Sequence, residues 1–376
     1  MLLSHRRAHA RIAAGLFAGL GLQVGVWAVL IPHLVATRDL TPAALGAGLA
    51  IMAATSIGAL AAAGPLADRV GRRPLAVAGA AGFAASFALL AGVESQAALW
   101  PTLALYGVAS GFLDLAANAV GSDYERAHDV RAMIRLHAGF SGAAAIGALM
   151  AGVVGPDAYW VLVVVYVALA AVVAVAPLPP HESAAPESLP PGGRLELLRT
   201  PAIAVAVALC ALCFFGDGAI EGYAALFLRD VLESGAVLTG VALAAFHTAS
   251  LAGRLVFSRP ASERLVLTIA GLLASAAMAV VVLAGSAAVA AAGLLVVGFA
   301  LAPVVPTALS LAGRNAPGRS ATAVSLVTTI GYSAFVLGPP AVGLLASATS
   351  LRTALIPVVA STAMIALLAR RVGQTT

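Results

Sequence analysis

The sequence contains no lysine: all 21 residues in the Lys and Arg count are arginine. Without lysine, the chain has neither a P-loop of its own for ATP nor a Schiff-base partner for pyridoxal phosphate. Charge is scarce altogether: charged residues are 10% of the 376, whereas a soluble domain carries about a quarter. Hydrophobic residues are 61%. These absences indicate a membrane protein that is not an enzyme and for which no cofactor is expected.

Cysteine is also nearly absent. The two cysteines, Cys210 and Cys213, form the segment CALC inside an apolar run. A structural zinc site needs four ligands, and the sequence offers no second cluster of them. We therefore predict no metal site and assign both thiols to helix packing.

What the sequence has in abundance is long apolar runs. Runs of about 20 residues, the length that crosses about 30 Å of hydrocarbon, recur along the whole chain with short loops between them. The first run is too long for a cleaved signal peptide, so we expect it to be retained. Twelve transmembrane helices are predicted, at residues 12–35, 43–63, 75–93, 98–120, 135–155, 159–178, 201–228, 237–256, 265–284, 288–311, 323–346 and 352–370.

The arginines predict the orientation of these helices. Eighteen of them fall in the two termini and in alternate loops, and only Arg38, Arg229 and Arg352 fall on the other side. Basic residues gather on the cytoplasmic side of membrane proteins, so both termini are predicted to be cytoplasmic. The isoelectric point near 9.8 reflects this topology and gives no reason to expect a nucleic-acid partner.

A proline-rich break divides the chain near its middle. Residues 179–200 hold five of the 20 prolines, which remove amide donors and disfavour helix. We interpret this segment as an extended cytoplasmic linker. It separates a predicted N-terminal six-helix bundle, residues 1–178, from a predicted C-terminal six-helix bundle, residues 201–376.

The two halves share short motifs. GPLADRVGRR begins at Gly64 and GRLVFSRPASER begins at Gly253, 189 residues later. GFSG at 139–142 and GYSA at 331–334 lie 192 residues apart. A steady offset of about half the chain is typical of the internal repeats of transporters. The predicted fold is therefore an all-α membrane protein of twelve helices in two pseudo-symmetric six-helix bundles.

The segment GPLADRVGRRPL, between the second and third predicted spans, resembles the loop 2–3 signature of the major facilitator superfamily. GFLDLAANAVGSDYER from residue 111 and EGYAALFLRDVL from residue 221 resemble a bacterial sugar-permease-like branch, distantly similar to fucose permeases. The resemblance covers the whole chain. It implies a multi-pass transporter of the bacterial inner membrane that works as a monomer by alternating access.

The loop signature is expected to form a gate. Its glycines permit a tight turn, and its aspartate can accept hydrogen bonds from the N-terminal amides of a helix. The resemblance implies that this aspartate braces the two halves, while the arginines latch the gate or bind the headgroups of membrane lipids. The predicted gate residues are Gly64, Asp68, Arg69, Gly71, Arg72 and Arg73. Ser258 replaces the aspartate in the second copy, so we expect an asymmetric gate.

Three acidic residues lie inside predicted spans. Asp217 and Glu221 interrupt the seventh span in the segment FFGDGAIEGY, and Asp114 lies in the fourth span, one turn before Asn118. Residues four apart share a helix face. An acid near the bilayer centre costs about 2.5–3.5 kcal/mol on insertion scales, and no arginine is expected near the middle of a span to neutralise these three. The resemblance implies that spans 1, 4, 7 and 10 line the cavity, and the first span adds Gln23.

These polar residues are interpreted as the binding site for a small-molecule solute and for protons. We hypothesise that Asp114 or Glu221 carries the coupled proton while the other acids bind solute hydroxyls. For Asp217, a structural role through local backbone bonds is an equal alternative. Pro303 and Pro306 are expected to bend the tenth helix beside the site. His247, in the eighth span, is either a hydrogen-bonded structural residue or a pH-responsive element of the gate.

The leading functional prediction is a secondary active transporter of a small polar solute, such as a sugar or a related metabolite, coupled to protons. The alternative within transport is an exporter of hydrophobic or cationic drugs, which the unpaired acids and the aromatic residues of the seventh span would suit. A different class is a non-transporting receptor or assembly subunit, but such a scaffold needs neither a gate signature nor acids on cavity helices. An ion channel is disfavoured because the sequence has no filter-like segment.

Overall fold

The computed structural model describes the backbone of residues 2–93, 95–130, 132–180, 196–257, 262–316 and 320–372. Within these ranges it leaves out the side chains of residues 2–4, 64, 65, 68, 134, 320–322 and 325. The described residues form helices and no strands, which agrees with the predicted all-α class. The contacts of the chain fall into two compact units, Met1–Ala184 (unit 1) and Ala185–Thr376 (unit 2).

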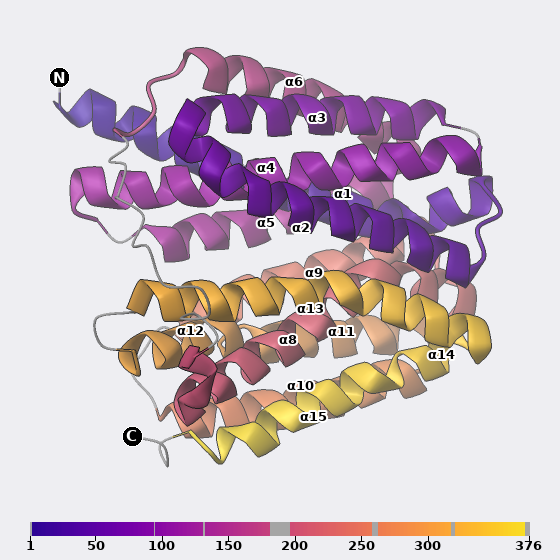
Figure 1. The fold of residues 1–376 in the computed structure, drawn as a ribbon. Helices are drawn as coiled ribbons and strands as arrows, with labels where there is room; N and C mark the ends of the chain where they lie inside the picture. The colour runs from indigo at the N-terminus through magenta and orange to yellow at the C-terminus, as the bar shows by residue number, and fades with distance from the viewer. Residues whose placement is uncertain are drawn as a thin grey trace. The chain divides into compact units, whose positions relative to one another are not determined.

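The helices follow the predicted spans closely (Figure 1). Unit 1 contains α1 (Leu2–Thr37), α2 (Pro42–Val70), α3 (Arg72–Gly92), α4 (Gln96–His128), α5 (Met133–Val154), the 3₁₀ turn η1 (Gly155–Asp157) and α6 (Ala158–Val175). Unit 2 contains η2 (Leu197–Arg199), α8 (Pro201–Leu226), the π-helical turn η3 (Phe227–Val231), α9 (Ala236–Val256), α10 (Glu263–Leu283), α11 (Ala287–Leu301), α12 (Val304–Arg314), α13 (Ser320–Ala348), α14 (Leu351–Ala354) and α15 (Ile356–Ala369).

The helices that could cross a membrane number eleven among the described residues. One of these stretches, Arg135–Val175, is 41 residues long, which is enough for two crossings of about 20 residues each. It contains both α5 and α6, which are separated at Gly155, where φ is +62°. Counting α5 and α6 separately gives the predicted number of twelve.

The predicted linker, residues 179–200, lies mostly outside the described residues, because 181–195 are not described. Its last part is not extended: Leu197–Arg199 form a single 3₁₀ turn before Pro201 begins α8. The domain boundaries of the sequence analysis stay predictions.

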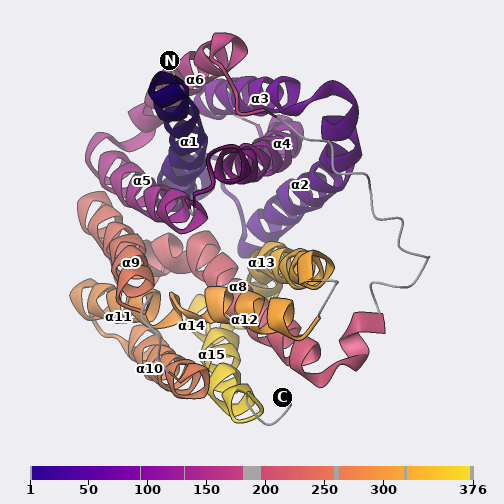
Figure 2. The same cartoon turned by 90° about the vertical axis from the view of Figure 1, so that its left-hand side faces the viewer.

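Helices pack in the same order in both units. In unit 1, α1 packs on α5, α2 on α4, and α3 on α6; in unit 2, α8 packs on α13, α9 on α11, and α10 on α15. Figure 2 looks along the helices and shows these partners side by side. Numbered by predicted span within each half, the pairs are 1–5, 2–4 and 3–6 both times. The pseudo-symmetric relation of two bundles to one another stays a prediction.

Most of these pairs require glycine at the contact, as α1–α5 and α8–α13 illustrate. A Cβ atom on Gly25 of α1 would lie 1.9 Å from the carbonyl oxygen of Ala144 in α5. A Cβ atom on Gly218 of α8 would lie 2.1 Å from the carbonyl oxygen of Phe335 in α13. Because Gly218 lies between Asp217 and Glu221, this contact also fixes which face of α8 the two acids occupy.

Helix ends are closed by side chains. Hydroxyl oxygens accept a hydrogen bond from the amide three residues further on at the start of α2, α4, α10, α11 and α14, as expected for N-caps. These residues are Thr41, Ser95, Ser262, Ser286 and Ser350. Two arginines close C-terminal ends: Arg38 donates to the Leu90 carbonyl of α3, at 2.9 Å, and Arg352 donates to the Ala284 carbonyl after α10, at 3.0 Å. Both belong to the three that depart from the predicted arginine distribution, so each has a structural role that explains its position.

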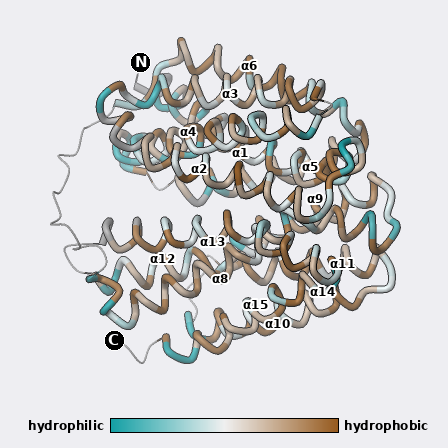
Figure 3. The backbone as a smooth tube through the Cα atoms, turned by 45° about the vertical axis from the view of Figure 1, so that its right-hand side comes forward, coloured by the Kyte–Doolittle hydropathy of each residue, from teal (hydrophilic) through white to brown (hydrophobic). Residues whose placement is uncertain are grey.

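The outer surface of the helices is apolar. Hydrophilic residues gather toward helix ends, and hydrophobic residues follow the middle of the helices (Figure 3). Large side chains such as Val153 and Val164 are 73% and 68% exposed. Such a surface suits contact with lipid, because a helix with an internally bonded backbone can meet hydrocarbon directly.

Candidate functional site

In unit 1, the acid of α4 is hydrogen-bonded to its predicted neighbour. The Asn118 side-chain amide donates to the carboxylate of Asp114, at 3.0 Å, and to the Asp114 backbone carbonyl, at 2.9 Å. Both side chains are half-buried. Among the described residues no cation pairs with Asp114. The structure therefore confirms that the two residues share a face, and it leaves the second carboxylate oxygen as an acceptor.

Gln23 belongs to a different contact within unit 1. Its side-chain oxygen accepts a hydrogen bond from the hydroxyl of Tyr106, and only 4% of Gln23 is exposed. The Tyr106 ring also lies 5.0 Å from the ring of Trp27, centroid to centroid. Tyr106 precedes Asp114 by two helical turns on α4, which is about 12 Å along the axis. Gln23 is therefore in a buried polar contact of its own, apart from the Asp114–Asn118 pair.

In unit 2, Asp217 and Glu221 lie one turn apart on α8. A spacing of four residues places them about 6 Å apart along the helix axis and on one face. Both are half-buried. The Cys213 sulfur, one turn before Asp217, lies 4.0 Å from its carboxylate and 4.0 Å from the Leu301 carbonyl. The sulfur of Cys213 therefore lies between Asp217 and the end of α11.

Among the described residues no arginine lies near the middle of a span, as predicted, but one near the end of a span influences this pair. The guanidinium of Arg254, on α9, interacts electrostatically with Asp217, Glu221 and Cys213. Arg254 lies two residues before the end of α9, where the sequence places it at the membrane boundary. Long side chains on a helix lean toward its N-terminus, so Arg254 is directed back into the unit. Asp114 has no such counter-charge among the described residues.

Cys210 and Cys213 are both buried and unpaired. No group of three or more His, Cys, Asp and Glu side chains in the described part of the chain could hold a metal ion.

His247, on α9, is only 4% exposed, and its Nε2 atom has no hydrogen-bond partner among the described residues. A buried polar atom of this kind carries a free-energy cost, which does not fit the interpretation of a fully hydrogen-bonded structural histidine.

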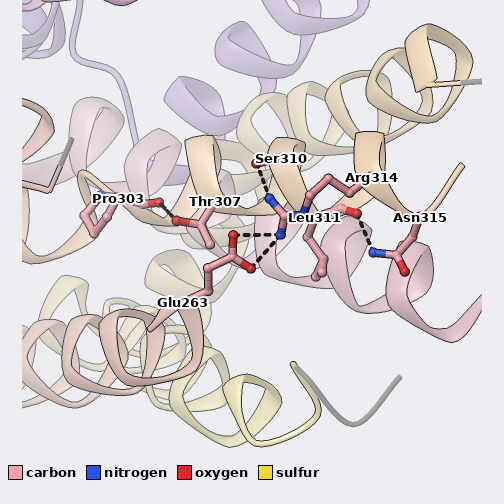
Figure 4. Close-up of polar contacts among 7 residues, drawn as sticks. All are labelled: Glu263, Pro303, Thr307, Ser310, Leu311, Arg314 and Asn315. Carbon is pink, nitrogen blue, oxygen red and sulfur yellow. Dashed lines mark hydrogen bonds and ion pairs between the residues drawn. The ribbon is translucent and has the colours of Figure 1, made fainter. Parts of the chain in front are cut away.

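The tenth predicted span is broken where its prolines lie. Helix α11 ends at Leu301 and α12 begins at Val304, with Pro303 at its N-cap position. Thr307 donates its hydroxyl to the Pro303 carbonyl at 2.7 Å, which satisfies one oxygen at the break (Figure 4). The predicted bend is therefore confirmed, as an interruption of the helix close to the Cys213–Asp217 contact.

The predicted gate is described only in part. Gly71 has φ of +85° and joins α2 to α3, so the tight turn is confirmed. Arg69 is exposed, and Arg73 donates to the carbonyls of Val173, at 2.8 Å, and Ala176, at 2.9 Å, at the end of α6. The surroundings of Gly64 and the side chain of Asp68 lie outside what the structure describes, so the role of Asp68 stays a prediction.

Arg72 takes part in an ion pair that sequence reasoning missed. Its guanidinium lies 3.6 Å from the carboxylate of Asp123, near the end of α4, and Arg126 pairs with the same carboxylate. The side chains of Arg72 and Asp123 are 15% and 2% exposed. The pair ties the start of α3 to the end of the helix that carries Asp114.

Unit 2 has an ion pair at the corresponding positions with the charges exchanged. Glu263, at the start of α10, lies 191 residues after Arg72, and Arg314, at the end of α12, lies 191 residues after Asp123. One guanidinium nitrogen of Arg314 donates to both carboxylate oxygens of Glu263, at 2.7 Å each, and another donates to Ser310 at 2.5 Å (Figure 4). The side chains are 52% and 33% exposed. An offset of 191 lies within the 189–192 range of the sequence repeat, which could have revealed both pairs together.

Known proteins resemble this chain over most of its length. The family model described as Major Facilitator Superfamily matches residues 12–339. Membrane protein MosC of Rhizobium meliloti is 28% identical over 343 residues, 90% of this chain and 84% of that protein. An uncharacterized MFS-type transporter of Yersinia pestis is 29% identical over 347 residues, 89% of this chain and 88% of that protein.

Solved structures have the same fold. The nucleoside transporter NupG superposes with a TM-score of 0.75 at 11% identity, over 97% of this chain and 98% of that one. The human organic anion transporter MFSD10 superposes with a TM-score of 0.68 at 17% identity, over 97% and 99%. At these identities the likeness establishes the fold and no more. None of the relatives named here is described as a fucose permease, so that narrower resemblance stays a prediction.

Proposed function

We propose that this chain, which belongs to the Major Facilitator Superfamily, is a secondary active transporter that moves a small polar solute by alternating access, coupled to protons. Its family membership makes it a multi-pass membrane transporter and not an enzyme. The observation that carries the proposal is the set of three carboxylates, Asp114, Asp217 and Glu221, inside helices of a membrane protein. Ionisable residues in that environment are costly and are found where a solute or ion passes.

The acids of α8 are suited to binding a proton. Asp217 and Glu221 share the field of one guanidinium, that of Arg254. Two carboxylates and one guanidinium leave one negative charge, which a proton or a cationic group of the solute can cancel. Like charges one helical turn apart also disfavour ionisation of both carboxyls together. We assign the coupled proton to this pair, with Glu221 as the preferred carrier.

Asp114 and Asn118 are suited to binding a neutral polar solute. The side-chain NH₂ group of Asn118 donates a hydrogen bond to one carboxylate oxygen of Asp114. The other carboxylate oxygen and the side-chain carbonyl oxygen of Asn118 remain as acceptors. Acceptors of this kind bind hydroxyl groups. A nucleoside, which the name of one structural neighbour mentions, carries such hydroxyls on its ribose, as a sugar does. An organic anion, which another neighbour's name mentions, would be repelled by the carboxylate of Asp114.

One observation favours the alternative, an exporter of hydrophobic cations. Phe214 stacks on Tyr332 with ring centroids 5.3 Å apart, and Phe335 lies edge-on to Phe214 at 6.2 Å. Aromatic faces beside carboxylates suit a lipophilic cation. Against this, Arg254 already supplies a positive charge to the acids of the same unit.

A ligand panel tests the proposal. The thermal unfolding midpoint of the purified full-length chain is measured in mild detergent with sugars, nucleosides, sugar acids and lipophilic cations. A ligand that binds only the folded state at 100 times its Kd stabilises it by about 2.7 kcal/mol. We expect stabilisation by a neutral hydroxylated compound. Stabilisation by lipophilic cations alone would establish the exporter, and no response to any compound would favour the non-transporting receptor.

The proposed location is the bacterial inner membrane, with both termini cytoplasmic and a monomer as the working unit. The 18 to 3 distribution of arginines supports this orientation. A thiol-labelling experiment tests it directly: a cysteine placed at Thr375 should react with a membrane-impermeant reagent only after the cells are opened. Labelling in intact cells would show that the C-terminus lies outside the cytoplasm and would contradict the proposed orientation.

A further inference from the structure

Unit 1 carries an apolar groove that the proposed function does not use. The groove has a volume of about 420 Å³ and lies between α1, α5 and α6. Every residue that lines it is apolar, including Gly15, Ala18, Gly19 and Leu22 of α1, Ile146 of α5 and Leu169 of α6. Helix α5 packs mainly on α1, and α6 packs mainly on α3, so the two helices on either side of the groove make few contacts with each other.

Small residues of α1 form the floor of the groove. At Gly15, an added Cβ atom would meet only Leu169, at 3.9 Å, which leaves room for further atoms. The rim carries exposed apolar side chains, among them Ile146, which is 62% exposed. A volume of a few hundred Å³ is on the scale of a small-ligand site and not of a helix interface. The lining therefore suits a single flexible hydrocarbon chain.

A cation lies at one end of the groove. Arg11 is one turn before Gly15 on α1, and it shares a helix face with Gly15, Ala18 and Leu22, at spacings of 4, 7 and 11 residues. It is exposed, and no acidic residue pairs with it within the described ranges. Its side chain leans toward the N-terminus of α1, away from the groove, as long side chains of helices do.

The position of Arg11 matches the depth of a lipid headgroup. Arg11 immediately precedes the predicted first span, which begins at Ile12, so it lies at the border of the hydrocarbon while the groove lies inside it. The opposite wall reaches Val172, close to the end of α6. Figures 1 and 2 both show the start of α1 at the same end of unit 1 as the end of α6. The charged end of the groove is therefore the end nearest the membrane surface.

We propose that this groove binds one acyl chain of an anionic phospholipid, with the phosphate of the lipid held by Arg11. The apolar lining takes the chain, and charge complementarity at Arg11 selects the anionic headgroup, as basic residues at the membrane border do elsewhere. Arg7, one turn further toward the N-terminus and also exposed, extends the positive end. The proposal is independent of the solute that the protein moves.

Native mass spectrometry of the purified full-length chain tests this site. The probes are palmitoyl-oleoyl phosphatidylglycerol and palmitoyl-oleoyl phosphatidylcholine, which share their acyl chains and differ in headgroup charge. The wild type should retain one phosphatidylglycerol in preference to phosphatidylcholine. Arg11→Gln should reduce that preference about fivefold, the factor that corresponds to ~1 kcal/mol per basic residue near an anionic lipid. Arg6→Gln, an exposed arginine off the groove face of α1, should leave the preference unchanged.

A second variant tests the groove itself. Gly15→Leu places a side chain in the groove and should reduce retention of both lipids, while Gly58→Leu on α2, where an added Cβ meets no atom within 4 Å, should not. Size-exclusion chromatography verifies that each variant is folded, and Ala18→Leu replaces Gly15→Leu if that variant aggregates. An unchanged lipid preference in Arg11→Gln, or full lipid retention in the groove-filling variant, would overturn the proposal. A dimer that excludes lipid would instead assign the groove to a second copy of the chain.

Discussion

The two units tie the same pair of helix positions together with opposite charges. In unit 1 the arginine begins α3 and the aspartate lies near the end of α4, whereas in unit 2 the glutamate begins α10 and the arginine ends α12. Burial differs as well: the Asp123 side chain is 2% exposed, and Glu263 is 33% exposed. The repeat therefore keeps the location of the ion pair and not its polarity, which indicates that the requirement at this position is a link between the two helices.

The span acids of the two units also differ in their neighbours. Asp114 of unit 1 accepts a hydrogen bond from a neutral amide, while Asp217 and Glu221 of unit 2 lie in the field of Arg254. A neutral neighbour leaves an acceptor for solute hydroxyls, and a charged neighbour makes the protonation of the acids depend on a nearby cation. We propose that this difference divides the work of transport, with solute binding in unit 1 and proton binding in unit 2.

The largest effect is expected from breaking the buried ion pair of unit 1. Asp123→Asn removes the carboxylate that pairs with both Arg72 and Arg126. Breaking a buried pair by removing one partner costs about 3–5 kcal/mol, because the remaining charge is left uncompensated. Chemical denaturation in detergent should show a loss of this size. A loss below 1 kcal/mol would mean that the half-buried Arg72 finds another partner or reaches water.

A smaller effect is expected from Arg254→Gln, which removes the cation beside the acids of α8. Two carboxylates without a cation repel each other most when both are ionised, so the loss of stability should be larger at pH 7.5 than at pH 5.5. We expect about 1–3 kcal/mol at the higher pH, as for a buried charged group that loses its partner. Unfolding midpoints at the two pH values measure this, with the exposed Arg264→Gln as the matched control. Equal losses of stability at both pH values would show that Arg254 does not act on the acids of α8 through its charge.

The smallest effect is expected at the exposed pair of unit 2. Glu263→Gln should cost about 0.2–1 kcal/mol, the range of exposed ion pairs, although the two-oxygen geometry with Arg314 favours the upper part of it. The exchange of both residues, Glu263→Arg with Arg314→Glu, reproduces the polarity of unit 1 and should restore the stability that either single change removes. Denaturation of the two single variants and the double variant measures the coupling. A double variant no more stable than the singles would show that polarity matters here.

Local patterns in the sequence were sufficient to predict the helices and the polar pairs on one helix. The apolar runs predicted twelve spans, Pro303 and Pro306 predicted a bend where α11 gives way to α12, and the four-residue spacing predicted that Asp114 and Asn118 share a helix face. Contacts between helices were not predictable in the same way. Arg254 lies at the end of its helix in the sequence, and only the packing of unit 2 brings its long side chain to the acids of α8.

The exchanged ion pairs show a second limit of sequence reasoning. The repeat was recognised from motifs that keep their residue types, such as glycine in the loop after the second span of each half. Arg72 and Glu263 do not match as residue types, so the comparison of the halves did not align them. The pairing becomes visible only when Asp123 and Arg314, at the same offset of 191 residues, are seen to carry the complementary charges.

Proton movement in proteoliposomes tests the central claim most directly. A pH-sensitive dye is trapped inside liposomes that contain the full-length chain, and a gradient of the solute that stabilises the protein is applied. The wild type should move protons only when the solute is present. Glu221→Gln, which keeps the size of the side chain and removes its charge, should still bind the solute but move no protons with it. Proton movement in Glu221→Gln equal to that of the wild type would contradict the assignment of proton coupling to the acids of α8.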